Sequence, residues 1–281
     1  MSSSTVSTKT LGTALITGAS AGIGEVYADR LARRGYDLIL VARNKTRLCT
    51  LAQRLKRETG RSVETVAADL NNKSDLARVE AILRNDPAVT LLVNNAGVAA
   101  VTPLVNSDVE AMDDMIRLNV IALTRLAYAA APAFVARHNG TIINIASVVA
   151  IAPEQLNGVY GASKAFVLAL SHSLHHELAD KGVRIQAVLP GATATDIWDK
   201  AGKPLHTLPA AILMSTGDMV DAALSGLDQG EVVTIPALPD KAEWDRFEAA
   251  RRAMSGKLSN AVPAPRYNNK LSAPAPMLAR A

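Results

Sequence analysis

One tyrosine and one lysine of this sequence have a spacing that could support proton transfer. Tyr160 and Lys164 are four residues apart in a stretch with helical periodicity, so both side chains lie on one face of the predicted helix. A free phenol has a pKa near 10, and a neighbouring ammonium favours the phenolate and lowers that pKa. We therefore expect Tyr160 to donate and accept protons. Taken alone the pair is a weak signal, because a partly buried tyrosine and a surface lysine often have this spacing.

A serine precedes this pair at the end of a predicted strand. Ser147 stands thirteen residues before Tyr160. In a parallel sheet, the carboxyl ends of the strands form the crevice in which ligands bind. A hydroxyl at this place could hold a substrate oxygen, so Ser147 is a third candidate catalytic residue.

A glycine-rich turn follows the first predicted strand. Thr17-Gly18-Ala19-Ser20-Ala21-Gly22-Ile23-Gly24 leads from that strand into the first helix. Small residues let a pyrophosphate approach the backbone closely, and the N–H groups at a helix N-terminus bind the anion. Three residues separate the first two glycines, so the spacing differs from G-x-G-x-x-G. We expect a dinucleotide here, and a plain strand-to-helix turn is the alternative.

The end of the second predicted strand indicates which dinucleotide. An acid usually stands there for the ribose 2′-hydroxyl of NAD, whereas an arginine suits a 2′-phosphate. Here the residues are Leu40-Val41-Ala42-Arg43-Asn44, with no acid nearby. We expect NADP(H), with NAD(H) the weaker choice. For the arginines and lysine that follow (Arg47, Arg54, Lys56 and Arg57), a solvated helix face is the better interpretation.

The positions of these residues depend on an alternating order of strands and helices. Short apolar runs predict seven strands: Thr13–Thr17, Asp37–Val41, Ser62–Ala67, Val89–Val93, Thr141–Ala146, Val183–Leu189 and Val232–Ile235. Helical periodicity predicts Gly22–Arg34, Lys45–Thr59, a helix containing Leu76–Arg84, Asp108–Arg137, Tyr160–Lys181, Met219–Leu227 and Asp240 to about Lys257. This order is typical of an α/β fold: a single doubly wound Rossmann domain, with a seven-stranded parallel sheet flanked by helices on both faces.

The chain is expected to hold one domain over residues 11–259. Residues 1–10 are predicted to be disordered, and the proline-rich residues 260–281 to form an extended tail. The single cysteine, Cys49, cannot form an internal disulfide, so we expect a reducing, cytoplasmic location.

Composition excludes several classes of protein. Forty-nine per cent of the residues are hydrophobic and the net charge is +4, so the chain is not disordered and charge alone does not imply nucleic acid. The basic helix has no interleaved aromatic residues on which bases could stack. The first ten residues lack an apolar signal core. The longest apolar run covers residues 127–136, whereas a spanning helix needs about 20 apolar residues, so no membrane segment is expected.

Several motifs recur together in a known family. They are Thr17 to Gly24, Asn94-Asn95-Ala96-Gly97, Asn119, Ser147, Tyr160, Lys164 and Pro190-Gly191, in this order. In them the chain resembles the single-domain short-chain dehydrogenases/reductases over about residues 10 to 237. The resemblance implies an NADP(H)-dependent oxidoreductase that transfers a hydride between the nicotinamide and a carbonyl compound or secondary alcohol. The alternative is a non-catalytic NADP-binding sensor or scaffold of the same fold, but all four catalytic positions are filled.

The resemblance also implies roles for single residues. Tyr160 would be the acid/base, Lys164 would tune it and bind the nicotinamide ribose, and Ser147 would orient the carbonyl. Asn119 would hold a water that relays protons from Lys164, unless it is merely a solvated helix residue. The cofactor-binding residues expected from the glycine turn, from Arg43 and from the resemblance are Gly18, Ser20, Gly22, Ile23, Gly24, Arg43, Asp69, Leu70, Asn95, Ala96, Gly97, Tyr160, Lys164, Pro190, Gly191, Thr193 and Thr195. Asp69 could instead only shape its turn, and Thr193 stands where the family more often has valine.

The resemblance further predicts a substrate lid over about residues 192–217. Its apolar residues, such as Trp198 and Ile212, would suit an apolar carbonyl compound or secondary alcohol, although most of them could simply pack the lid onto its own domain. The helices around 108–137 and after Lys164 form the usual subunit contact of the family, so we expect a homodimer or homotetramer. No metal site is expected, because His172 and His176 have no third ligand and no H-E-x-x-H pattern.

Overall fold

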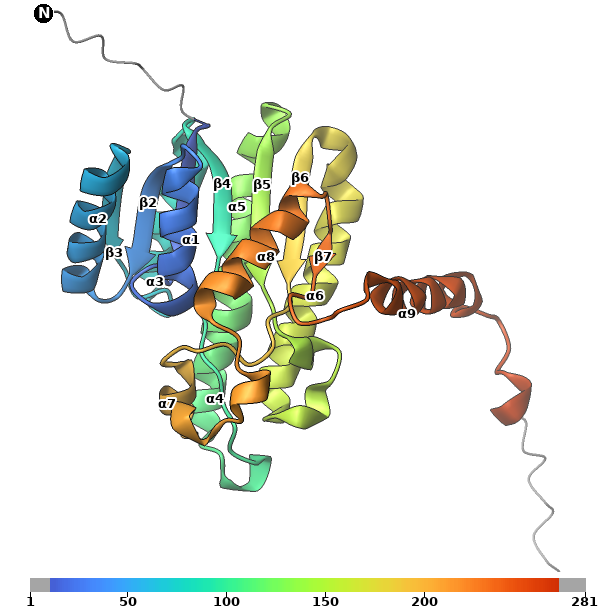
Figure 1. The fold of residues 1–281 in the computed structure, drawn as a ribbon. Coiled ribbons are helices and arrows are strands. Elements are labelled where there is room, and N and C mark those ends of the chain that lie inside the picture. Colours follow the sequence, from blue (N-terminus) through green and yellow to red (C-terminus); the bar gives the residue numbers. More distant parts are fainter. Residues whose placement is uncertain (1–10, 268–281) are drawn as a thin grey trace, which may run out of the picture. The chain divides into compact units, whose positions relative to one another are not determined.

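A computed structural model describes residues 11–267 of the chain (Figure 1). The predicted disorder of residues 1–10 and most of the predicted tail, from residue 268 onward, lie outside this range. The chain divides into two compact units, Met1–Ala237 and Leu238–Ala281. The predicted domain extended to residue 259, whereas this division falls earlier, at the point where the alternation of strands and helices ends.

The first unit contains one parallel sheet of seven strands, as the strand pattern predicted. They are β1 Thr13–Thr17, β2 Asp37–Ala42, β3 Val63–Ala67, β4 Val89–Asn94, β5 Gly140–Ile145, β6 Val183–Val188 and β7 Val233–Thr234. Their order across the sheet is β3-β2-β1-β4-β5-β6-β7. The chain therefore winds outward in both directions from the neighbouring strands β1 and β4, and ligands of such sheets bind at the carboxyl end of this switch point.

Helices connect the strands on both faces of the sheet. In the first unit they are α1 Gly22–Arg33, α2 Lys45–Thr59, α3 Lys73–Asn85, α4 Val109–Ile116, α5 Leu123–Ala136, α6 Gly158–Leu178, α7 Ile197–Lys200 and α8 Thr216–Asp228. The single helix predicted over 108–137 is interrupted in the middle, because Arg117–Ala122 forms a wider π-helical turn between α4 and α5. Wide turns of this kind are frequent at functional sites.

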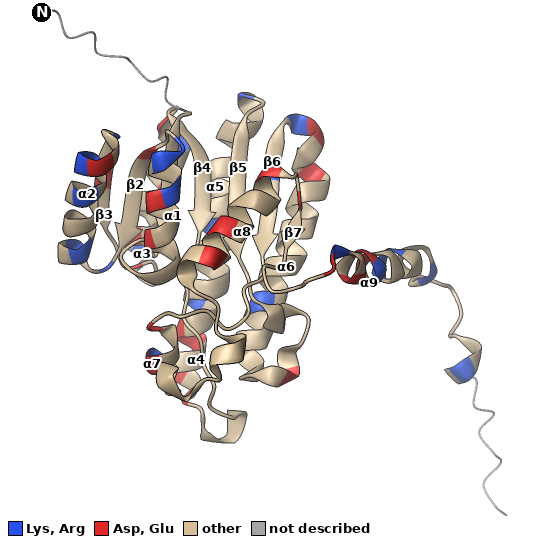
Figure 2. Ribbon diagram, viewed as in Figure 1, with Lys and Arg blue, Asp and Glu red and all other residues tan. Residues whose placement is uncertain are grey.

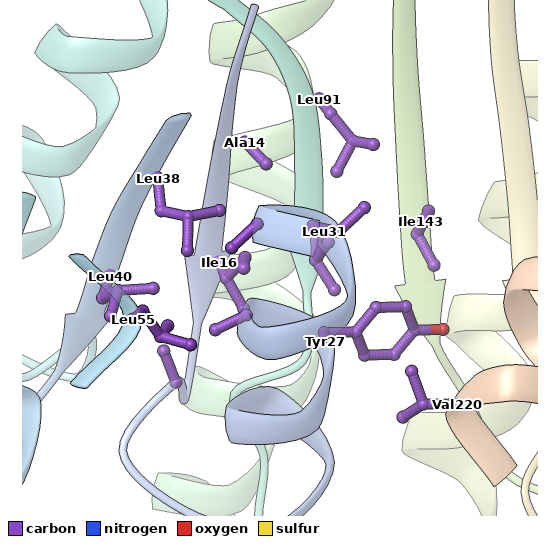
Figure 3. Close-up of a cluster of buried hydrophobic side chains, with 14 of the residues drawn as sticks. Ala14, Ile16, Tyr27, Leu31, Leu38, Leu40, Leu55, Leu91, Ile143 and Val220 are labelled. Carbon is purple, nitrogen blue, oxygen red and sulfur yellow. The ribbon is translucent and has the colours of Figure 1, made fainter. Parts of the chain in front are cut away.

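Alternating strand residues build two apolar layers. In β1, Ile16 faces the layer that contains Tyr27 of α1 and Val220 of α8, whereas Leu15 faces the layer of α3, α5 and α6. Figure 3 shows the first layer, with Ile16, Leu31 and Tyr27 between the strands and the helices. Burial of these side chains on both faces is the main force that holds the helices on the sheet.

One helix in the described part of the chain, Val109–Ala136, is long and apolar enough to cross a membrane by length and composition. In this structure Leu126, Ala130 and Phe134 of that helix are buried in the layer that covers the sheet. A helix that packs on a sheet needs apolar residues on the face that it buries. The apolar composition of this helix is accounted for here by its packing on the sheet.

The second unit contains helix α9, Lys241–Met254, which was predicted to belong to the main domain. Asp240 caps this helix by accepting a hydrogen bond from the backbone N–H of Ala242 (2.9 Å). The rings of Trp244 and Phe247 lie 5.3 Å apart. Figure 2 shows charged residues of both signs on α9, α1 and α2, whereas the central strands β1, β4 and β5 carry none.

Candidate active site

The first turn of α6 places Tyr160 at the carboxyl end of the sheet. The side-chain oxygen of Asn157 caps this helix, accepting hydrogen bonds from the backbone N–H groups of Val159 (2.9 Å) and Tyr160 (3.3 Å). Tyr160 and Lys164 are buried, on the face of α6 that points inward. The four-residue spacing thus brings the two side chains into one site, as predicted.

Lys164 is held by the neighbouring strand. Its ammonium nitrogen Nζ donates a hydrogen bond to the carbonyl oxygen of Ile145 (2.9 Å) and lies 5.9 Å from the centre of the Tyr160 ring. Complete burial disfavours the charged form and lowers the pKa of Lys164 to about 8.

The environment of Tyr160 is mainly apolar. Its ring belongs to a buried cluster with Ala100, Met115 and Val149. Burial raises the pKa of Tyr160, and a side-chain hydrogen bond with Ser147 opposes that rise. We expected Lys164 to lower this pKa; instead the pKa is raised, and Lys164 is not among the groups that shift it.

Ser147 joins the site from the end of β5. It caps a short 3-10 helix, Val148–Ala150, and its hydroxyl donates a hydrogen bond to the carbonyl oxygen of Pro190 (3.4 Å). The Ser147 side chain lies close enough to the Tyr160 hydroxyl to lower its pKa against the effect of burial. The structure therefore brings together Ser147, Tyr160 and Lys164 beside Pro190.

Asn119 lies in the π-helical turn and is 1 % exposed, so the alternative of a solvated helix residue is wrong. Its side-chain nitrogen donates to the carbonyl oxygen of Val98 (2.9 Å) and to the hydroxyl of Ser163 (3.2 Å), and its oxygen accepts from the N–H of Val98 (3.0 Å). A Cβ atom on Gly97 would lie 3.0 Å from Asn119 Oδ1 and 3.6 Å from Lys164 Nζ. Asn119 is therefore next to Lys164 and fixes the segment after β4.

The glycine turn is tightly packed against the next strand. Gly18 has a φ of +66°, and a Cβ atom there would lie 2.7 Å from Asn95 Nδ2. Asn95 donates hydrogen bonds to the carbonyl oxygens of Thr17 (2.9 Å) and Gly18 (3.2 Å). A Cβ atom on Gly24 would collide with the carbonyl oxygen of Gly18. Gly18 and Gly24 are thus required because a side chain at either position would collide with the neighbouring backbone or with Asn95.

The N-terminus of α1 fits an anion. No side chain caps it, whereas Asn44 caps α2 and Asn72 caps α3. The first N–H groups of a helix need an acceptor from outside the helix, and a pyrophosphate is one. The residues of this turn therefore fit the predicted dinucleotide.

Arg43 follows β2 directly, and its side chain is exposed. No acidic side chain within residues 11–267 pairs with it. Arg54, by contrast, forms ion pairs with Glu25, Asp29 and Glu58, which agrees with its interpretation as part of a helix face outside the cofactor site.

Asp69 shapes its own turn. Its carboxylate accepts a hydrogen bond from the N–H of Asn71 (3.0 Å), and its N–H donates to the carboxylate of Asp75 (2.8 Å). The neighbouring Leu70 is buried in the core. This geometry favours the structural alternative for Asp69 and leaves its contact with adenine a prediction.

The base of the predicted lid is ordered by backbone hydrogen bonds. Ala194 N–H donates to Met214 (2.9 Å), and Met214 N–H donates to Ala192 (2.9 Å), so the two ends of the lid are joined. The Trp198 indole donates to the carbonyl oxygen of Thr193 (2.9 Å). A Cβ atom on Gly22 would lie 3.1 Å from Thr195 Cγ2, which places the lid base beside the glycine turn.

Sequence reasoning missed two residues of this site. Thr17 accepts hydrogen bonds through its hydroxyl from the N–H groups of Asn95 and Ala96, both at 3.0 Å, and so connects β1 to the segment after β4. Asn157 caps α6. Asparagine just before a helical pattern is a known start signal and could have identified Asn157, whereas no local pattern points to the contacts of Thr17.

The family model for short chain dehydrogenases matches residues 12–205. The chain is a short-chain dehydrogenase. It belongs to a family of oxidoreductases that act on CH–OH groups with NAD(P), so the enzyme class and fold implied by the motifs are confirmed.

Similar proteins support this assignment for the short-chain dehydrogenase. A short-chain dehydrogenase of Sphingobium yanoikuyae, solved in complex with NADPH, is 50% identical with a TM-score of 0.89, over 92% of this chain and 100% of that one. The bulky-bulky ketone specific alcohol dehydrogenase of Comamonas testosteroni is 44% identical with a TM-score of 0.85, over the same shares. The very-long-chain 3-oxoacyl-CoA reductase of Anas platyrhynchos is 34% identical over 70% of this chain and 64% of that enzyme.

Proposed function

We propose that this short-chain dehydrogenase interconverts an apolar ketone and a secondary alcohol with NADP(H), and that Tyr160 is its acid/base. The observation that carries this proposal is the burial of Tyr160, Ser147 and Lys164 in one site, with the ammonium of Lys164 5.9 Å from the centre of the Tyr160 ring. Ser147 follows β5, and Tyr160 and Lys164 lie on α6, which begins at the carboxyl end of the sheet, where ligands of this fold bind.

The glycine turn and Arg43 would hold the cofactor. The nicotinamide, when bound, supplies or accepts the hydride. The uncapped N-terminus of α1 suits the pyrophosphate, and the exposed guanidinium of Arg43 suits the 2′-phosphate. The relative from Sphingobium yanoikuyae solved with NADPH supports the choice of NADP(H) over NAD(H).

Tyr160 and Ser147 would act on the substrate oxygen. In reduction, Tyr160 donates its hydroxyl proton to the oxygen while Ser147 donates a hydrogen bond to it, and in oxidation Tyr160 takes the proton back. Two fixed donors in a water-poor site stabilise the charge that develops on this oxygen. Lys164, whose ammonium lies 5.9 Å from the centre of the Tyr160 ring, would bind the nicotinamide ribose.

The surroundings of Tyr160 support an apolar substrate. Ala100, Met115 and Val149 belong to the same buried cluster as the ring, and partly buried side chains of Val98, Met112 and Leu156 extend this cluster. Groups beside a carbonyl that reaches Tyr160 would therefore contact hydrocarbon. The names of the relatives from Comamonas testosteroni and Anas platyrhynchos, which act on bulky ketones and long acyl chains, agree with this chemistry.

The assembly remains a proposal as well. Ile121 in the π-helical turn is 45% exposed, and Tyr128 in α5 is 63% exposed. Phe166 on α6 is 40% exposed. Large apolar side chains exposed on two neighbouring helices are typical of a subunit contact. We propose that these helices pair two copies of the chain, in a homodimer or homotetramer located in the cytoplasm.

The decisive experiment replaces the Tyr160 hydroxyl. Tyr160→Phe keeps the ring and its packing but removes the proton donor, so the turnover of aryl and branched ketones with NADPH should fall about 10²- to 10⁴-fold. The Kd for NADPH should stay within about twofold of wild type. The exposed Tyr128→Phe is the matched control and should keep full turnover. Normal turnover by Tyr160→Phe would contradict the assigned role.

A further inference from the structure

Asn157 connects two segments that lie far apart in the sequence. It is 3% exposed, and all of its side-chain polar atoms have partners. The oxygen accepts hydrogen bonds from the N–H groups of Val159 and Tyr160 and so caps α6. The nitrogen donates to the carbonyl oxygen of Thr102 (2.6 Å) and to the hydroxyl of Ser107 (3.1 Å).

The segment bound by this nitrogen is the connection between β4 and α4, residues 95–108. Its beginning is fixed by Asn119, which binds both backbone polar groups of Val98. Its far end is fixed by Asn157 through Thr102 and Ser107. Ala100, between these two attachments, is buried in the same apolar cluster as Tyr160. This connection therefore forms one wall of the apolar cluster around the Tyr160 ring.

We propose that Asn157 is a positioning residue that holds the 98–107 wall against Tyr160 and thereby sets the affinity of the enzyme for its carbonyl substrate. One amide serves both sides: its oxygen fixes the helix turn that carries Tyr160, and its nitrogen fixes the wall that faces the ring. The proposal rests on the proposed function, in which Tyr160 contacts the substrate oxygen.

The roles of the amide oxygen and the amide nitrogen of Asn157 can be tested separately by substitution. Asn157→Asp keeps an oxygen that caps α6, and an aspartate is as good a cap as an asparagine. The same change replaces the nitrogen with an oxygen that faces the carbonyl oxygen of Thr102, so the wall loses its attachment. Asn72→Asp is the matched control, because Asn72 caps α3 in the same way but its side-chain nitrogen has no hydrogen bond within residues 11–267.

Kinetics and amide hydrogen exchange test the proposal together. We expect Asn157→Asp to raise the KM for the ketone about tenfold or more, with a smaller change in kcat and an unchanged Kd for NADPH. Exchange of the backbone amides in residues 98–107 should become faster, while exchange in the first turn of α6 stays slow. The control Asn72→Asp should change neither quantity.

A second variant covers the case in which Asn157→Asp does not fold. Ser107→Ala removes only one of the two attachments and should raise the KM in the same direction by a smaller factor. A wild-type KM and wild-type exchange in both variants would overturn the proposal, as would an equal loss of NADPH affinity. Tyr160→Phe, measured alongside, distinguishes the two ideas: if it is inactive while Asn157→Asp and Ser107→Ala keep the wild-type KM, the role of Tyr160 stands and that of Asn157 does not.

Discussion

The ammonium of Lys164 donates its hydrogen bond to the backbone carbonyl of Ile145 in β5, 2.9 Å away. This contact ties α6 to β5 and holds the ammonium 5.9 Å from the centre of the Tyr160 ring. Burial lowers the pKa of Lys164 and raises that of Tyr160, so the site favours the uncharged form of both groups. The charged form of either group is therefore held in the site only at the expense of stability.

The first prediction concerns this cost. The pKa of Lys164 falls from 10.5 to about 8 on folding, so between these pH values the unfolded chain binds more protons than the folded one. Stability from this group consequently rises as the pH rises through that window. We expect the unfolding free energy of wild type, relative to Lys164→Met, to increase by about 3 kcal/mol between pH 7 and pH 10.5.

Chemical denaturation of the two proteins at several pH values measures this difference. Subtracting the variant cancels the titration of all other groups, because the two chains differ at one residue. If the unfolding free energies of wild type and Lys164→Met differ by the same amount at pH 7 and at pH 10.5, folding does not lower the pKa of Lys164.

A second prediction concerns the choice of cofactor. Arg43→Ala removes the guanidinium proposed to bind the 2′-phosphate, and a hydrogen bond between charged groups contributes about 1.5–3 kcal/mol. The KM for NADPH should rise about 10- to 100-fold, whereas the KM for NADH should stay unchanged. Arg57→Ala, at the far end of α2, removes the same charge from an exposed site and serves as the control. Equal effects of Arg43→Ala on both cofactors would reject this role.

The glycine turn gives a third prediction. In Gly24→Ala the new methyl group meets the carbonyl oxygen of Gly18 and Asn95 Nδ2. Overpacking of this kind costs about 1–3 kcal/mol, and moving the turn also weakens the anion site. We expect lower stability in urea together with a higher Kd for NADPH. Gly256→Ala, where nothing lies within 4 Å of the added atom, should change neither.

The proposed assembly is tested on the outer face of α5. Tyr128→Glu places a charge at the centre of the expected contact, which should shift the protein to a smaller species in light scattering. Thr50→Glu, on the exposed side of α2, adds the same charge on the opposite face of the sheet and should leave the mass unchanged. If wild type already has the mass of a single chain, the assembly proposal fails.

Much of the fold could be predicted from local patterns. The bounds of β1 agree with the prediction, and those of the longer strands agree within a residue or two, because continuous apolar runs between glycine and helix signals mark buried parallel strands. The last strand is the shortest, Val233–Thr234, since only two residues of the apolar run pair with β6. Helix starts were less certain: α6 begins at Gly158 instead of Tyr160.

The candidate site was harder to predict in its contacts than in its residues. Motif spacing located Ser147, Tyr160 and Lys164, but the pKa of Tyr160 depends on Ala100 and Met115, which reach it through the tertiary fold. The attachment of Asn157 to Thr102 joins residues 55 positions apart, and no local pattern encodes such a pairing. The π-helical turn was missed for a related reason, because its apolar residues also fit a regular helix.

That turn has a consequence for insertions and deletions. One residue of a helix corresponds to a rotation of about 100°, so the extra residue per turn in Arg117–Ala122 sets the faces of α4 and α5 out of phase. A single deletion there could restore regular helical geometry and conserve every apolar residue, yet it would swing Met115 and the rest of α4 away from the ring they now cover. The packing of α4 therefore constrains the number of residues in this short stretch as well as their identity.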